Sequence, residues 1–260
     1  MDSDMTFDPS RIKALTFDVG GSVFDWQTPV IAHVGQLAAH HSVELDAHEF
    51  AHRWRRRFFA VIAEIRAGKR TKMNADEIHR HLLDGVCEHY ALPATDADKD
   101  ELTWVWHAMG VWSDVPEALE RLRTRYKVTI LSVLSLSILV DSSKHAGISW
   151  DGMMSCEFLT HYKPEPESYR QGAALLACDV EHTHDIKVAI PRRAIIGRKH
   201  DHRVATHGVR RVAVEQMQHS VCMFRIIPIS INDPKHLRLS FVSCREGGAK
   251  RYRSRDAIHI

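Results

Sequence analysis

The sequence predicts an α/β protein with a parallel sheet and a helical insertion. Residues 12–17 form a short apolar run that ends at Asp18 and two glycines, as expected for a buried strand that enters a tight loop. Beyond residue 114, helical and strand-like segments alternate, which is typical of parallel sheets covered by helices. Between these regions, apolar residues recur mostly every three or four positions, the spacing of amphipathic helices.

The region of residues 29–112 is expected to be mostly helical. Phe50, Trp54 and Phe58 follow one another at four-residue spacing, which places them on one face of a helix. Asn74 is a suitable N-cap for a second amphipathic segment, because its side chain can accept a hydrogen bond from the first helical turn. A stretch of this length is long enough for an inserted helical domain.

Alternating elements are expected after this region. A helix that starts at Pro116 precedes a strand-like run, and Gly147 is suited to end the following helix. The expected helices cover residues 116–126, 138–146 and 167–176, and the expected strands cover residues 127–132, 193–197 and 209–214.

The composition is typical of a globular cytoplasmic protein. Hydrophobic residues make up 44% of the 260 and charged residues 26%. No run of 18 apolar residues is present and the polar N-terminus lacks the layout of a secretory signal, so we expect no membrane span and a cytoplasmic location. Five scattered cysteines without a C-x-x-C pair indicate reduced thiols rather than a disulfide framework or a zinc knuckle.

The net charge of +2 conceals a division of charge along the chain. Residues 1–186 hold 19 Lys and Arg against 28 Asp and Glu, whereas residues 187–260 hold 16 against 5. A basic segment can bind nucleic acid, but only Phe224, Phe241 and Tyr252 supply aromatic rings here, so we expect no nucleic-acid partner. A solvated surface and a divergent or altered-frame tail remain open as explanations.

Three loops at expected strand ends carry side chains suited to catalysis. Asp18 enters a glycine loop whose free N–H groups can stabilise negative charge, Ser132 ends a strand, and Lys163 precedes a proline. In parallel sheets, ligands bind at such ends. An ammonium group that faces Asp18 would keep its carboxylate ionised and nucleophilic. Taken alone, Asp18 is equally typical of an ordinary loop, Ser132 is uninformative, and Lys163 is more typical of a surface residue, so the combination carries the prediction.

In this order and spacing, the segments resemble the haloacid dehalogenase superfamily, and most closely its (S)-2-haloacid dehalogenase type II branch. The likeness covers residues 11–176 and is strongest at Trp-Ser-Asp-Val-Pro-Glu-Ala-Leu-Glu-Arg-Leu (112–122), Ala-Gly-Ile-Ser-Trp-Asp (146–151) and Tyr-Lys-Pro-Glu-Pro-Glu-Ser-Tyr (162–169). It implies a Rossmann-like core at residues 10–26 and 114–214, a helical cap domain at 27–113 and a divergent basic extension at 215–260.

The resemblance also implies a reaction, the hydrolytic removal of halide from small 2-haloalkanoic acids through an aspartyl ester. Asp18 matches the nucleophile of that family, and Lys163 matches its motif-three lysine. The other matches are Ser22 for a loop hydroxyl, Ser132 for the motif-two serine, Tyr169 for a tyrosine that supports the site, and Arg55 for the cap arginine that receives halide or substrate carboxylate.

Two substrate-binding positions depart from the family pattern. The superfamily phosphatases carry an acid two residues after the nucleophile, where this chain has Gly20. Halide leaves without a proton, so this absence favours a dehalogenase over a magnesium-dependent phosphatase or phosphonatase. The dehalogenases usually have an aromatic residue there, and they have an asparagine where this chain has Val133.

The fourth motif is degraded. Asp201 is the candidate for the acid that orients the hydrolytic water, although the spacing before it is shorter than the family pattern. Beyond Val214 the resemblance ends. A catalytically degenerate binding protein is therefore a further alternative.

We expect no metal and no organic cofactor. The histidine pair His79 and His81, like His182 and His184, has two-residue spacing, whereas helical zinc pairs use four-residue spacing, so surface histidines are the favoured interpretation. The expected partner is a small-molecule haloacid. Because dimers are common in the family, a homodimer is possible.

Overall fold

The computed structural model describes residues 12–179, 183–188, 222–228, 237–243 and 258–259. Its contacts divide the chain into two units, Met1–Asp185 and Ile186–Ile260. This division does not test the predicted boundaries of a core, a cap and an extension, which stay predictions. None of the described helices combines the length and the apolar character needed to cross a membrane.

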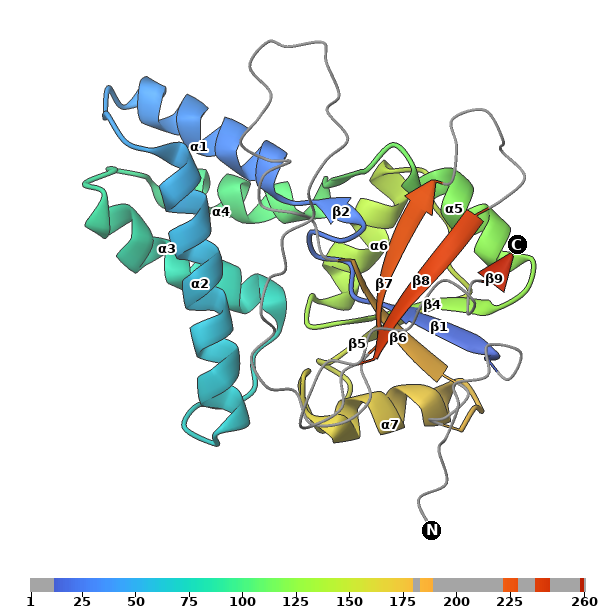
Figure 1. Cartoon of the computed structure of the whole chain (residues 1–260). Helices are drawn as coiled ribbons and strands as arrows, with labels where there is room; N and C mark the ends of the chain where they lie inside the picture. The colour runs from blue at the N-terminus through green and yellow to red at the C-terminus, as the bar shows by residue number, and fades with distance from the viewer. Residues whose placement is uncertain (1–11, 180–182, 189–221, 229–236, 244–257, 260) are drawn as a thin grey trace. The chain divides into compact units, whose positions relative to one another are not determined.

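A three-stranded parallel sheet in the first unit confirms the predicted α/β class (Figure 1). Its strands lie in the order β5 (Gly152–Ser155), β4 (Lys127–Ser132) and β1 (Ala14–Phe17). All four residues of β1 are buried, because the apolar run 14–17 packs on both of its faces. Since the three strands are parallel, Asp18 and the loop after β4 come to the same edge of the sheet.

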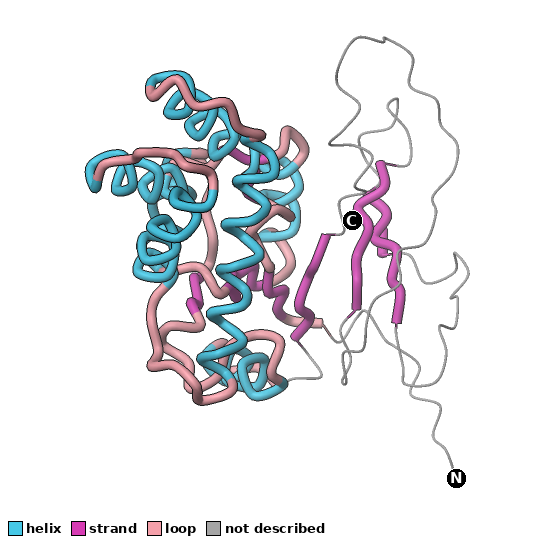
Figure 2. The backbone as a smooth tube through the Cα atoms, turned by 90° about the vertical axis from the view of Figure 1, so that its left-hand side faces the viewer, coloured by secondary structure: helices cyan, strands magenta, loops and turns pink. Residues whose placement is uncertain are grey.

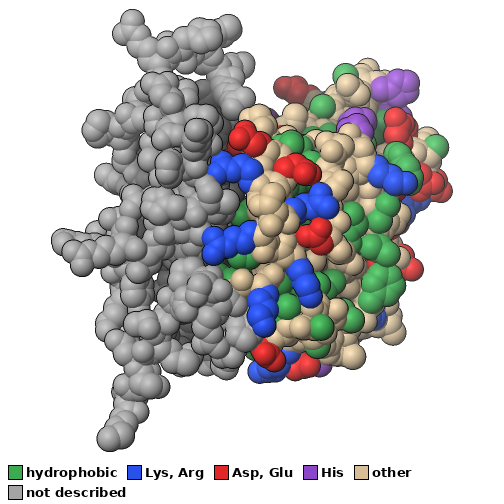
Figure 3. Space-filling view, turned by 90° about the vertical axis from the view of Figure 1, so that its right-hand side faces the viewer, with side chains coloured by type: hydrophobic (Ala, Val, Ile, Leu, Met, Phe, Trp, Pro, Cys, Tyr) green, Lys and Arg blue, Asp and Glu red, His purple; other side chains and the backbone are tan. Residues whose placement is uncertain are grey.

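Three helices accompany this sheet: α5 (Val115–Arg123), α6 (Leu136–His145) and α7 (Pro166–Leu175). A Cβ atom added at Gly172 of α7 would come 3.3 Å from Leu131 Cδ2, so the glycine allows close packing of this helix on β4. On the face shown in Figure 3, positively and negatively charged side chains of the described residues are interspersed. Such mixing is typical of a solvated surface.

The predicted helical region consists of four helices, which Figures 1 and 2 show gathered beside the sheet elements of the same unit. They are α1 (Gln27–His40), α2 (Ala47–Arg66), α3 (Ala75–His89) and α4 (Asp96–Trp104), followed by the short 3-10 helix η2 (Val105–His107). Phe50, Trp54 and Phe58 are buried on one face of α2, as their spacing predicts. Asn74 caps α3 through a capping box with Glu77, which confirms the predicted N-cap.

The chain enters and leaves this helical region through one antiparallel ribbon. The ribbon joins β2 (Phe24–Asp25) to β3 (Gly110–Val111), and Phe24 pairs with Val111. Because the two connections are hydrogen-bonded to each other, the helices are tied to the sheet by a paired rather than a single-stranded link.

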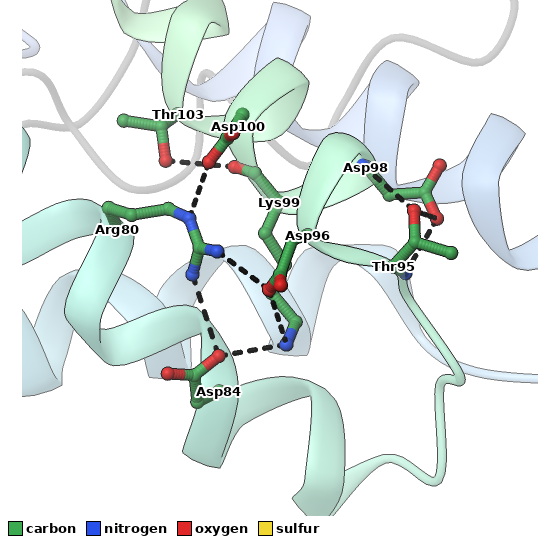
Figure 4. Close-up of polar contacts among 8 residues, drawn as sticks. All are labelled: Arg80, Asp84, Thr95, Asp96, Asp98, Lys99, Asp100 and Thr103. Carbon is green, nitrogen blue, oxygen red and sulfur yellow. Dashed lines mark hydrogen bonds and ion pairs between the residues drawn. The ribbon is translucent and has the colours of Figure 1, made fainter.

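Ion pairs join α3 to α4 at the surface (Figure 4). Arg80 contacts Asp100 at 2.5 Å and Asp96 at 2.8 Å, while Lys99 contacts Asp84 at 2.8 Å. Exposed pairs contribute only about 0–1 kcal/mol each. We therefore assign this network to the packing of two helices and not to a binding site.

The second unit contains strands only, among its described residues. They are β6 (Thr183–Val188), which begins in the first unit, β7 (Cys222–Pro228), β8 (Leu237–Ser243) and β9 (Ile258–His259). β6 and β7 are parallel, whereas β8 is antiparallel to both β7 and β9. The predicted strands at 193–197 and 209–214, and Asp201, lie outside the described residues.

Candidate active site

Asp18 is the first residue after β1 and opens a tight loop. The backbone N–H groups of Val23 and Phe24 both donate to the Val19 carbonyl oxygen, at 3.1 and 2.9 Å, which closes the loop. Gly21 has a positive φ of 103°, a conformation that side chains disfavour. The side chain of Asp18 keeps 35% of its surface exposed, so a ligand can reach its carboxylate.

Lys163 lies against this carboxylate. Its Nζ atom is 3.6 Å from Asp18 Oδ1, and only 5% of its side chain is exposed. Nζ also donates to the Leu131 carbonyl oxygen at 2.8 Å and lies 5.4 Å from the centroid of the Tyr169 ring. The structure thus brings together Asp18, Lys163 and Tyr169, three of the predicted site residues. The buried ammonium places a positive charge directly beside the carboxylate.

The two predicted serines shape the loops around Asp18. Ser22 Oγ donates to the backbone oxygen of Asp18, and it is 8% exposed. Ser132, 1% exposed, ends β4, and its Oγ accepts a hydrogen bond from the Leu134 N–H at 3.2 Å. Val133, the residue between Ser132 and Leu134, is half-buried. The hydrogen bonds of both hydroxyls therefore run to the backbone of the loops that surround the carboxylate.

Arg55 reaches the same loop from α2. Its Nη2 atom donates to the Gly20 carbonyl oxygen at 2.8 Å, and its guanidinium lies 4.6 Å above the Trp26 ring and 5.1 Å from the Phe59 ring. Burial lowers the pKa of Arg55 to about 10, and the charge of Asp18 acts in the opposite direction. The guanidinium is therefore cationic at neutral pH.

The glycine at position 20 leaves room for this guanidinium. A Cβ atom there would lie 3.4 Å from Arg55 Nη2 and 3.8 Å from Leu134 Cδ1. A larger side chain would compete with Arg55 for the same space. Glycine at position 20, where the resemblance implies an aromatic residue, thus lets Arg55 contact the loop backbone directly.

One interpretation of the sequence was wrong. His79 is not a surface residue but is 1% exposed, and its ring stacks on Phe58 and Trp106 at centroid distances of 4.5 and 4.0 Å. Burial, followed by the nearby charge of Arg55, lowers the pKa of His79 to about 3. Its exposed neighbour His81 fits the prediction.

Sequence reasoning also missed Trp26, which supports Arg55, and the buried His107, which follows Trp106. Trp26 stacks in parallel on Trp106, with ring centroids 5.5 Å apart. The only signal for these residues was a density of aromatic rings in the helical region, which equally predicts an ordinary core.

The described residues contain no group of three or more His, Cys, Asp or Glu side chains arranged to hold a metal ion. Because Asp201 lies outside these residues, its part in the site and the predicted lack of a metal stay predictions. What the geometry does provide is a partly exposed carboxylate with an ammonium group next to it and a guanidinium from the helical region nearby. Such an arrangement suits a carboxylate nucleophile and an anionic substrate.

No family model matches the sequence, and neither does any curated protein. Among solved structures, a defluorinating L-2-haloacid dehalogenase is 32% identical with a TM-score of 0.65, over 70% of this chain and 76% of that one. A second L-2-haloacid dehalogenase is 26% identical with a TM-score of 0.63, over 67% and 75%. The L-2-haloacid dehalogenase of Xanthobacter autotrophicus, with chloropropionic acid covalently bound, shares the fold at 18% identity and a TM-score of 0.59, over 67% and 69%.

Proposed function

Because the chain belongs to the haloacid dehalogenase superfamily, we propose that it hydrolyses small 2-haloalkanoic acids to 2-hydroxy acids. The contact of 3.6 Å between Lys163 Nζ and Asp18 Oδ1 carries this proposal, since it pairs a candidate carboxylate nucleophile with a positive charge at the carboxyl edge of a parallel sheet. The haloacid is the proposed small-molecule partner. The cytoplasmic location and the homodimer remain predictions.

In the proposed first step, a carboxylate oxygen of Asp18 attacks the halogen-bearing carbon. A carbon–oxygen ester bond forms while the carbon–halogen bond breaks, and the halide leaves with the bonding electrons. No proton is needed by this leaving group, so Gly20 in place of an acid is compatible with the step. Arg55 and Lys163 supply positive charge for the substrate carboxylate and the departing halide.

In the proposed second step, water attacks the carbonyl carbon of the Asp18 ester. The ester bond breaks, the 2-hydroxy acid leaves, and Asp18 returns as a carboxylate with release of one proton. The water needs a base, for which Asp201 is the candidate from the sequence. Neither step requires a metal ion or an organic cofactor.

Chloride release from 2-chloropropionate by the purified full-length chain tests the proposal. We expect release that is insensitive to EDTA and is abolished in Asp18→Asn, which keeps the shape of the side chain but not its charge. Release that persists in Asp18→Asn would falsify the mechanism. Magnesium-dependent hydrolysis of a phosphate ester without dehalogenation would instead identify the phosphatase alternative, and a folded protein inactive on both substrate types would identify a binding protein.

A further inference from the structure

A second charged group lies in η2, which packs against α6. His107 is only 5% exposed, and both of its ring nitrogens face carboxylates. Nε2 is 2.6 Å from Asp76 Oδ1, and Nδ1 is 2.7 Å from Asp141 Oδ2. Asp76 belongs to the first turn of α3 and Asp141 to α6. One imidazole thus links a helix of the insertion to a helix of the sheet layer.

This arrangement requires a protonated ring. A neutral imidazole has one donor and one acceptor, whereas an ionised carboxylate only accepts, so two hydrogen bonds to two carboxylates need the imidazolium. Burial alone lowers the pKa of His107, but the hydrogen bonds that the ring donates to Asp76 and Asp141 outweigh burial and raise that pKa above its ordinary value. Burial acts to raise the pKa of Asp76, but the hydrogen bonds that its carboxylate accepts from His107 and Ser135 lower that pKa overall.

Two further rings lie close to His107. His79 of α3 is titratable, and because burial lowers its pKa to about 3 it stays neutral. On α4, the Trp104 ring stacks on His107 with a centroid distance of 4.2 Å and an interplanar angle of 9°. An aromatic face favours the cationic form of a ring stacked on it.

The link continues toward the loop after β4. The second carboxylate oxygen of Asp76 accepts a hydrogen bond from Ser135 Oγ, and Ser135 is the N-cap of α6. Ser135 follows Leu134, whose side chain lies beside Gly20. The link therefore ends in the loop that carries Ser132.

A second branch leads to Arg55. The carbonyl oxygen of Trp106, the residue before His107, accepts a hydrogen bond from Ser142 Oγ of α6 at 2.9 Å. The Trp106 ring stacks on Trp26, and Trp26 in turn supports the guanidinium of Arg55. The position of η2 against α6 thus bears on where Arg55 stands relative to Asp18.

We propose that His107, in its protonated form, is a positioning residue that locks α3 and η2 onto α6 and so holds Arg55 beside the Asp18 loop. The inference rests on the proposed function as far as turnover is concerned, while the link itself is a property of the folded chain. His107 touches neither substrate nor reacting atoms. It acts through Asp76, Ser135 and Trp106.

The sign of the pH effect follows from the raised pKa. The stabilisation by His107 is complete below pH 6.5, where the ring is charged in both the folded and the unfolded chain, and it is lost as pH rises through the folded pKa. Above that value, one ring nitrogen faces a carboxylate as an unprotonated acceptor. The helical region then holds Arg55 less firmly, and turnover declines.

The first test needs no activity. Side-chain NMR of the histidine rings in the full-length chain is recorded against pH, and the His107 signal is identified by its loss in His107→Gln. We expect a titration midpoint above 6.5 in the wild type and a lower midpoint in Asp141→Asn, which keeps a hydrogen-bonding amide but removes one charge. A midpoint at or below 6.5 overturns the link. If His107→Gln does not fold by circular dichroism, the shift in Asp141→Asn still decides.

The second test follows chloride release from 2-chloropropionate against pH. In the wild type we expect kcat/KM to fall on the basic side across the pH range of the NMR midpoint. His107→Gln should lack this decline and be lower at pH 6.5 by about tenfold, as for the loss of a hydrogen bond to a charged group. His145→Gln, a change at an exposed histidine of α6, is the control and should resemble the wild type.

The two tests separate the two ideas. A basic decline that persists in His107→Gln rejects the positioning role even if the enzyme is active. A raised midpoint in a chain that releases no chloride rejects the proposed reaction and supports the link.

Discussion

Arg55 and Gly20 are joined by a hydrogen bond of 2.8 Å from a guanidinium nitrogen to a backbone carbonyl oxygen. The two residues come from α2 and from the loop after β1, so this contact fixes the helical region directly against the proposed nucleophile loop. The guanidinium also lies over the Trp26 ring, 4.6 Å from its centroid. Its planar shape serves both contacts at once, which an ammonium group cannot reproduce.

Replacing Arg55 by lysine tests this geometry. Lys keeps the positive charge but cannot stack on Trp26 while donating to Gly20, so we expect KM for 2-chloropropionate to rise by about tenfold or more, with a smaller change in kcat. Steady-state chloride release measures both constants. Arg57→Lys is the matched control, because Arg57 is an exposed arginine two residues after Arg55 on the same helix. This change should leave both constants unaltered. An unchanged KM in Arg55→Lys would contradict the assigned role.

Replacing Lys163 by methionine separates catalysis from stability. Methionine has a similar length without charge, but it removes only one partner of the ion pair and leaves the charge of Asp18 without its ammonium neighbour. We therefore expect chloride release to fall by a factor on the order of 100 or more, since an oriented charge of this kind is commonly worth that much in kcat. The melting temperature should fall only moderately, because Asp18 is 35% exposed and water can solvate its remaining charge.

Thermal unfolding and chloride release of the same preparation give the two readouts. Lys127→Met, at an exposed lysine of β4, is the control for loss of a surface charge. If Lys163→Met unfolds at a much lower temperature, the ammonium serves the fold and the loss of activity says nothing about Asp18.

Much of the first unit was predictable because local patterns there agree with tertiary structure. The apolar run at 127–132 coincides with β4, and the N-cap at Asn74 is present as expected. The strand β5 was missed because Gly152–Ser155 contains a glycine and two methionines, residues without strong strand preference. Its partner β4, and not its own sequence, selects the extended form.

The site was predictable only in part, for a related reason. Asp18 and Lys163 belong to motifs at strand ends, so chain order and fold class were sufficient to bring them together. His107 and its two carboxylates lie on three different elements, and no local spacing connects residues 76, 107 and 141. Such contacts arise when helices pack. The periodicity of a sequence predicts which face of a helix is buried, but it does not predict which other helix that face packs against.

The stacked ring of His79 leads to a last prediction, about stability in acid. Its pKa is lowered to about 3 by burial, so between pH 6.5 and that value the unfolded chain binds a proton that the folded chain does not. The stability contribution of this residue is therefore present above pH 6.5 and falls by roughly 1.4 kcal/mol for each pH unit below it.

His79→Phe keeps a ring between Phe58 and Trp106 and removes two buried nitrogen atoms that have no hydrogen-bond partner among the described residues. Urea unfolding at pH 7 and pH 5 should show a smaller loss of stability in His79→Phe than in the wild type, whereas His81→Phe, at an exposed position, should lose as much as the wild type. Equal losses in all three proteins would mean that the buried imidazole becomes protonated without unfolding the helices around it.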